Sequence, residues 1–235
     1  MSINKKNILI FDRIGVWYDL LSRILTLGLQ PHWYKTITDL LQDKGPLRIL
    51  DMACGTGKQI SSIIKHKVPL SSICGLDISE NMLLQARNKF QRNKLRNKIF
   101  LIHSDMHKLH FQTDFFDAAT MSFGLNYSSD NQTVLNEICR VLKKDSPLLM
   151  LDFFLPENSP LAKPFKLYVK HLFPLIGGLI AGSTSTLKQI ACTICDNPSI
   201  DSLQIQLRAA GFKKISSLTL FPGIVSIISC KKSTS

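Results

Sequence analysis

The sequence of 235 residues lacks any apolar run long enough to cross a membrane as a helix. Its longest apolar stretch, Leu172–Ala181, contains a proline and two glycines and falls well short of the ~20 residues that a spanning helix needs. Near the start, Lys5 and Lys6 precede only a short apolar piece before Asp12, so no secretory signal is predicted. We therefore expect a cytoplasmic protein whose contact with a membrane would be peripheral.

Acidic residues are scarce as well: 17 Asp and Glu stand against 29 Lys and Arg, which gives a formal net charge of +12. This excess favours a polyanionic surface, either nucleic acid or an anionic membrane. The sequence has no basic run with interleaved aromatic residues and no zinc-finger or RNA-recognition signature. We expect no nucleic-acid partner and a peripheral contact with an anionic membrane.

Cysteine chemistry is weakly represented. Of the six cysteines, only Cys192 and Cys195 form a C-x-x-C pair, and no second pair or histidine completes a zinc site. Nothing in the spacing demands disulfides, which fits a reducing cytoplasm. No Cys/His or Ser/His/Asp arrangement suggests covalent catalysis. We predict no metal site.

The most informative segment that the sequence does contain is Ile49–Gly57, an apolar run that ends in Asp51 and turns through small residues. Gly55 and Gly57 let the backbone approach a ligand closely, and the helix that follows offers free N–H groups at the same place. Asp77 ends the next apolar run, twenty residues beyond Gly57, where a carboxylate can accept hydrogen bonds from ribose hydroxyls. These features predict a nucleoside-binding crevice.

The bound nucleoside is indicated by what the turn omits. Ile60 stands where a dinucleotide fingerprint needs its third glycine, and no phosphate-binding P-loop occurs. Asp51 would repel a pyrophosphate but suits the cationic amino-acid part of S-adenosylmethionine (SAM). The segment resembles the D-x-G-x-G-x-G motif of class I SAM-dependent methyltransferases, with Ala53 and Cys54 inside that window.

Strand and helix patterns alternate along the middle of the chain, which predicts an α/β fold with a doubly wound parallel sheet. Ser79 is expected to cap one of the helices. Two helices are expected within residues 12–43, a mostly helical insertion within 155–195, and a closing helix at 200–210. The expected strands lie near 47–52, 72–77, 98–103, 115–122, 147–154, 213–220 and 224–230, the last two forming a hairpin about Pro222-Gly223; the expected core helices lie near 57–66, 80–94 and 131–143.

We interpret residues 1–235 as one domain with a seven-stranded, Rossmann-like sheet. Its expected parts are N-terminal helices (1–45), a SAM-binding core (46–154), a helical insertion on the substrate side (155–199), and a closing helix with a hairpin (200–235).

Four further segments resemble the ubiquinone/menaquinone biosynthesis C-methyltransferases, and the similarity runs from about Phe11 to Lys231. They are Phe11–Asp19 (F-[DS]-x-[VI]-[AG]-x-x-Y-D), Ser122–Leu125 (S-F-G-L), Tyr168–Gly177 (Y-x-x-H-x-x-P-x-[IL]-G) and Gly223–Val225 (G-[VI]-[VA]). The resemblance implies SAM as cofactor, a polyprenyl hydroquinone as substrate, and methylation of a ring carbon, with demethylmenaquinol as the expected acceptor.

The resemblance also implies roles for residues at the cofactor. Thr56 would lie at the glycine turn beside the methionine moiety, and Asp77 would hold the ribose. Asp105 and Met106 would hold the adenine, and Ser122 would complete the pocket wall. With Asp51, Gly55 and Gly57 from the turn, these are the predicted cofactor-binding residues.

Removing a phenolic proton from a hydroquinone pushes electron density onto the adjacent ring carbon, so a general base near the ring would help. The candidates are His171, Tyr168, Asp152 and Tyr18. His171 and Tyr168 lie three residues apart, and would share one face if their segment is helical.

Several departures from the family pattern leave alternatives open. Asn126-Tyr127 follow S-F-G-L where Arg-Asn is usual, Ser22 replaces an Asn, and Leu187–Gln189 replace a tyrosine-containing segment. The acceptor could be a naphthoquinol, a benzoquinol or another small-molecule or lipid compound. A SAM-binding protein that has lost catalysis and an RNA methyltransferase are further readings, and the oligomeric state, which could be a homodimer, is open.

Overall fold

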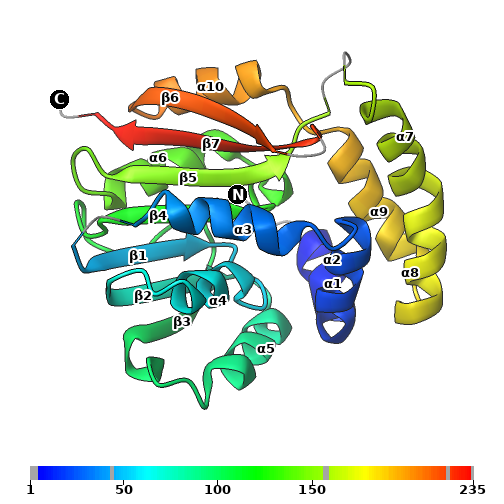
Figure 1. Ribbon diagram of the computed structural model, residues 1–235, viewed down its shortest axis with the longest axis horizontal. Helices are drawn as coiled ribbons and strands as arrows, with labels where there is room; N and C mark the ends of the chain where they lie inside the picture. The colour runs from blue at the N-terminus through cyan, green and yellow to red at the C-terminus, as the bar shows by residue number, and fades with distance from the viewer. Residues whose placement is uncertain (1–4, 43–44, 156–158, 221–222, 234–235) are drawn as a thin grey trace.

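A seven-stranded sheet forms the centre of the protein (Figure 1). The computed structural model describes residues 5–42, 45–155, 159–220 and 223–233. The strand order is β3-β2-β1-β4-β5-β7-β6; the first five strands are parallel, while β7 runs antiparallel to both of its neighbours. The strands are β1 (Leu47–Met52), β2 (Leu70–Asp77), β3 (Ile99–His103), β4 (Ala118–Ser122), β5 (Pro147–Phe153), β6 (Phe212–Leu220) and β7 (Val225–Lys232).

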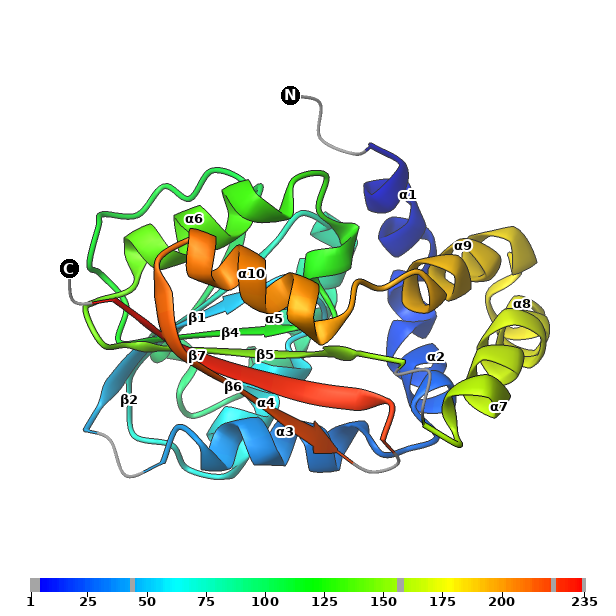
Figure 2. The ribbon, with the colours of Figure 1, turned by 90° about the horizontal axis from the view of Figure 1, so that it is seen from above.

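Helices cover both faces of the sheet, because its central strands are apolar on both sides. In β1, Ile49 packs into the core on the side of α3, α4 and α5, and Leu50 into the core on the side of α6 and α10. Figure 2 shows these two layers above and below the strands. The helices are α3 (Gln30–Asp39), α4 (Lys58–Lys65), α5 (Glu80–Phe90), α6 (Asn131–Val141) and α10 (Ile200–Ala209).

The remaining helices gather at the carboxyl ends of the parallel strands, on the right in Figure 1. They come from two segments distant in sequence, and α2 contacts α8. The first segment comprises α1 (Lys5–Ile14), a 3-10 turn (Gly15–Trp17) and α2 (Tyr18–Leu25); the second comprises α7 (Ala162–Leu167), a π-helical turn (Tyr168–Leu172), α8 (Phe173–Ala181) and α9 (Thr184–Cys195).

The alternating core, the helical insertion and the closing hairpin are confirmed, and Ser79 Oγ accepts a hydrogen bond from the Met82 N–H as a cap. The two helices predicted within 12–43 are confirmed as α2 and α3, and the same range also holds the end of α1 and a 3-10 turn. Strand β4 begins at Ala118 rather than 115, because the backbone N–H groups of Phe115 and Phe116 donate to the Val141 carbonyl at the end of α6 instead of joining the strand ladder. Of the predicted hairpin turn, Pro222 lies outside the described residues.

Two features that would indicate partners are absent from the described residues. In this part of the chain, no helix combines the length and apolarity that crossing a membrane requires. The same residues contain no group of three or more His, Cys, Asp or Glu side chains that could hold a metal ion.

Candidate functional site

The glycine turn after β1 is fixed by backbone conformation and by Asp77. Gly55 and Gly57 have φ values of +53° and +75°, and a Cβ at Gly57 would come within 2.6 Å of the Phe90 ring. Asp77, the last residue of β2, accepts hydrogen bonds from the N–H of Gly55 at 2.7 Å and from that of Ser79 at 2.9 Å. Asp77 therefore ties the turn to the neighbouring strand.

A cavity of about 810 Å³ opens beside this turn, and its walls come from the loops after β1, β2, β3 and β4. Five of the predicted cofactor residues line it: Gly55, Asp77, Asp105, Met106 and Ser122. We call it the cofactor cavity. The aromatic side chains that close it were not assigned to the cofactor by the sequence: Phe11, Tyr18, Phe123 and Tyr127.

Asp51 faces a smaller cavity of about 290 Å³ against the glycine turn, lined also by Thr56, Lys58 and Ser122. Its Oδ1 accepts a hydrogen bond from Thr120 at 2.7 Å, whereas Oδ2 and the Ser122 hydroxyl oxygen are buried with no hydrogen-bond partner among the described residues. Burial raises the pKa of Asp51 to about 7, and the charge of Asp77 adds to the shift. A buried carboxylate oxygen without a partner suits a cationic ligand group.

Asp105 belongs to a hydrogen-bonded chain that the sequence did not reveal. Its Oδ1 contacts Nδ1 of His107 at 2.6 Å and accepts from the His107 backbone N–H at 2.9 Å, and His107 Nε2 contacts Ser128 Oγ at 2.9 Å. Contrary to the sequence analysis, a Ser/His/Asp arrangement is therefore present. Ser128 Oγ also accepts from the Asp130 N–H, so the chain ties the loop after β4 to Asp105.

A second cavity of about 630 Å³ adjoins the first, and the two share Phe11, Tyr18, Phe123 and Tyr127 as a common wall. We call it the acceptor cavity. It lies between the N-terminal helices and the insertion, and most of its lining is apolar: Ile14, Leu21, Leu25, Phe153, Phe173, Leu187, Ile190 and Ile194.

Asp152 is the one carboxylate in the lining of the acceptor cavity. It lies near the end of β5, and burial raises its pKa to about 7. Oδ2 accepts a hydrogen bond from Asn126 at 2.9 Å; Oδ1 accepts from the Phe153 N–H at 2.8 Å and from Asn197 at 3.1 Å. A carboxylate with this pKa can take up a proton near neutral pH.

The other predicted bases lie elsewhere or hold their protons. The Tyr168 hydroxyl donates to the Ile24 carbonyl at 2.6 Å, and His171 is exposed; neither is among the residues that line the two cavities. The expectation that they share a face does not hold, because Tyr168–Leu172 is a π-helical turn rather than an α-helix. Tyr18 lines both cavities, but burial raises its pKa well above the usual range.

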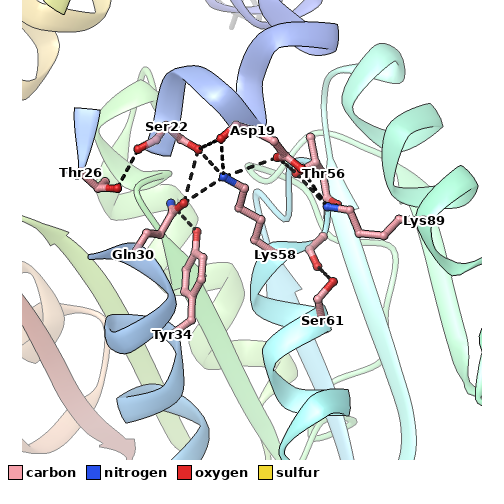
Figure 3. A network of polar contacts seen from close by, with 10 residues as sticks. Asp19, Ser22, Thr26, Gln30, Tyr34, Thr56, Lys58, Ser61 and Lys89 are labelled. Carbon is pink, nitrogen blue, oxygen red and sulfur yellow. Dashed lines mark hydrogen bonds and ion pairs between the residues drawn. The ribbon is translucent and has the colours of Figure 1, made fainter. Parts of the chain in front are cut away.

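Thr56 contacts the N-terminal helices, as Figure 3 shows. Its hydroxyl donates to Asp19 at 2.6 Å, and the Lys89 ammonium lies 3.2 Å from the same carboxylate. Lys58, 3.5 Å from Asp19, also donates to Ser22 and Gln30. Burial alone would raise the pKa of Asp19, but the Thr56 hydrogen bond and the two lysines hold it below its usual value. This Asp19 network fastens α2 to the glycine turn.

Comparison with known proteins identifies the class first. A SAM-dependent methyltransferase from Thermotoga maritima superimposes with a TM-score of 0.66 at 18% identity, over 95% of this chain and 98% of that one. The topology, together with the glycine turn and Asp77, defines the fold of class I SAM-dependent methyltransferases.

The family follows from sequence. The model of the ubiE/COQ5 methyltransferase family matches residues 2–232, and the chain belongs to this family. The demethylmenaquinone methyltransferase of Thermotoga maritima is 33% identical over 87% of this chain and 86% of its own length. That of Thermus thermophilus is 31% identical over 92% of this chain and 97% of its own.

Proposed function

We propose that this protein uses SAM to methylate a ring carbon of a reduced, demethylated polyprenyl quinone, and that this acceptor is demethylmenaquinol. Family membership and the names of the relatives support SAM-dependent C-methylation in quinone biosynthesis. The single observation that supports the proposed chemistry is the position of Asp152. This buried carboxylate lines an apolar cavity that shares a wall with the cofactor cavity.

The residues around the cofactor cavity fit SAM. Bound SAM supplies a methyl group already activated on a sulfonium, so the protein must bind, orient and exclude water. The unpartnered Oδ2 of Asp51 would hold the ammonium of the methionine part, with Ser122 beside it. Asp77 would hold the ribose, and Asp105 and Met106 the adenine. The Thr56 hydroxyl already donates a hydrogen bond to Asp19. Thr56 would therefore contact the methionine part of SAM while it holds that hydrogen bond.

Asp152 would act as the general base on the acceptor. It would take the proton of a ring hydroxyl, which raises electron density on the adjacent ring carbon, the atom to be methylated. The apolar walls suit a fused aromatic ring and the start of a prenyl chain. The oxidised quinone has no hydroxyl proton to give and is itself electrophilic, so it would not react.

Peripheral membrane contact is part of the proposal, since a polyprenyl quinol resides in the bilayer. Leu175 and Leu179 on α8 are 60% and 86% exposed, and Lys163, Lys166 and Lys170 precede them on α7 and the π-helical turn. Exposed leucines beside basic residues fit an anionic membrane surface. We call this group the α7–α8 surface.

The test is methylation with purified protein, SAM and a demethylated naphthohydroquinone that carries a short prenyl chain, under anaerobic conditions. We expect one added methyl group on a ring carbon, dependent on reductant. Equal turnover of the oxidised quinone, or a product methylated on oxygen, would overturn the mechanism. SAM binding with no product from naphthoquinol or benzoquinol would instead favour another acceptor or a protein without catalysis.

A further inference from the structure

We propose that Asn197 binds a hydroxyl group of the acceptor through its Oδ1 atom, and that Asn197 and Asp152 together select the reduced form of the acceptor over the oxidised form. Asn197 follows α9, in the connection to α10, and lines the acceptor cavity. No motif in the sequence indicates a role for it. The inference rests on the proposed function, because it concerns the acceptor of that same site.

The orientation of the Asn197 amide is fixed by its neighbours. Its Nδ2 donates to the Phe153 carbonyl oxygen at 2.5 Å and to Oδ1 of Asp152 at 3.1 Å. Both of these atoms are acceptors, so a flipped amide would place oxygen against oxygen. The Oδ1 atom is therefore held on the other side of the amide.

This Oδ1 atom is buried and has no hydrogen-bond partner among the described residues. A buried polar atom without a partner costs free energy, and a ligand donor that reaches it removes that cost. The only kind of group that can satisfy it is a donor. A ligand in this cavity can therefore satisfy Oδ1 of Asn197 only with an O–H or N–H group.

Several other polar side chains of the cavity lining already donate hydrogens to protein atoms. The hydroxyls of Thr26 and Thr193 donate to the carbonyls of Ser22 and Gln189, at 2.7 and 3.2 Å, so these hydrogens are already used. Asn126 points its amide nitrogen at Asp152. The atoms that Asp152 and Asn197 present to a ligand are therefore hydrogen-bond acceptors.

This arrangement distinguishes the two redox forms of a quinone. A hydroquinone carries two hydroxyl donors, one for Asp152 and one for Asn197 Oδ1. A quinone carries two carbonyl oxygens, which only accept, and would set oxygen against oxygen in an apolar cavity. Sites that hydrogen-bond a ligand hydroxyl reject analogues without it for the same reason.

Three probes test the proposal by anaerobic affinity measurements on the unmodified protein saturated with S-adenosylhomocysteine, which has no methyl group to transfer: 1,4-naphthohydroquinone, 1,4-naphthoquinone and 1,4-dimethoxynaphthalene. We expect the hydroquinone to bind about 10-fold or more tightly than the other two, as one or two neutral hydrogen bonds predict. The dimethoxy compound has the reduced ring without donors, so tight binding of it would show that ring shape decides. Equal affinities for the three would overturn the proposal.

Variants assign the effect to a residue. Asn197→Ala should reduce the preference for hydroquinone over quinone by about 5- to 10-fold, with unchanged SAM affinity. Thr193→Val is the matched control, because Thr193 lines the same cavity and its hydroxyl already donates to Gln189. An unchanged preference in Asn197→Ala would remove Asn197 from the proposal. Selective binding of the hydroquinone without methylation would refute the proposed function and leave this inference standing.

Discussion

The cofactor cavity and the acceptor cavity share a wall but are built from different kinds of sequence. The cofactor cavity is lined mainly by loops that follow four adjacent parallel strands, and its polar groups include Asp77, Asp105 and Ser122. The acceptor cavity lies between the N-terminal helices and the helical insertion, and its lining is apolar around Asp152. Under the proposed function, we expect the first to hold what methyltransferases share, and the second to hold what distinguishes one acceptor from another.

The largest expected effect comes from a substitution that impairs the acceptor cavity and leaves the cofactor cavity intact. Asp152→Asn should lower kcat by about 10²- to 10⁴-fold, the range for loss of a general base, and leave SAM affinity unchanged. In the unmodified protein, kcat/KM should rise with pH through about 7, because Asp152 must lose its proton to act. That inflection should disappear in the variant.

Tyr168→Phe is the control for this prediction. It removes a hydroxyl that donates to the Ile24 carbonyl and does not line the cavity, so it should retain the pH profile. A fully active Asp152→Asn protein, or a Tyr168→Phe protein that loses the inflection near 7, would contradict the assignment of the base.

The second prediction concerns a substitution that impairs the cofactor cavity and leaves the acceptor cavity intact. Asp77→Asn should weaken SAM binding by roughly 10-fold or more, since hydrogen bonds to a charged group contribute about 1.5–3 kcal/mol each. Calorimetry with SAM checks this, and affinity for the hydroquinone probe should change little. The exposed Asp201, in the first turn of α10, supplies the control Asp201→Asn. Unchanged SAM affinity in Asp77→Asn would refute the ribose assignment.

The third prediction concerns stability on the cofactor side. Asp51 has a pKa of about 7 in the folded protein against 3.8 ordinarily, so between these values the folded protein keeps a proton that the unfolded chain has released. Stability therefore falls as pH rises through this window. Asp51→Asn removes the effect, and should raise Tm at pH 8 by a few degrees at ~2–4 °C per kcal/mol.

Thermal unfolding at pH 5 and pH 8 measures the change in Tm caused by Asp51→Asn, and the increase in Tm should be smaller at pH 5. The same variant should bind SAM more weakly, because the acceptor for the ammonium is lost. The quantity to compare is the gain in Tm of the variant over the unmodified protein at each pH. An equal gain at pH 5 and pH 8 would contradict the prediction that ionised Asp51 destabilises the fold.

The smallest effect concerns the α7–α8 surface on the acceptor side. Lys170→Gln should lower partition to anionic vesicles by about 5-fold at low salt, since each basic residue contributes ~1 kcal/mol near such a surface. The difference should fade as salt is added. Lys94→Gln, an exposed lysine between α5 and β3, is the control. Equal loss in both variants would mean that net charge, and not this surface, drives binding.

The sequence predicted which residues meet at the glycine turn, because those residues sit at strand ends. Asp51 and Asp77 close apolar runs, and neighbouring parallel strands bring such ends together: Asp51 pairs in register with Gly75 and Thr120. Asp152 was predictable for the same reason. Even here, the bond between Thr56 and Asp19 spans 37 residues and left no local signal.

The acceptor side was harder to predict, because its contacts join segments with no common periodicity. Tyr168 binds a carbonyl 144 residues away, and Asn197 reaches Asp152 across 45 residues. The π-helical turn turned the motif pair Tyr168 and His171 away from a shared face. Motif spacing records which residues occur together in a family, whereas side-chain direction depends on how helices pack.

The position of β7 has a consequence for synthesis of the chain. β7 lies between β5 and β6, although β6 precedes it in sequence, so β6 has no neighbour in the sheet until residues 225–232 have emerged. Until then the edge of β5, whose seven residues are all buried in the finished fold, stays open to pairing with other chains. Aggregation during expression should therefore respond more sharply to changes that delay or weaken β7 than to equal changes in β6, whose residues from Ser216 to Thr219 are exposed.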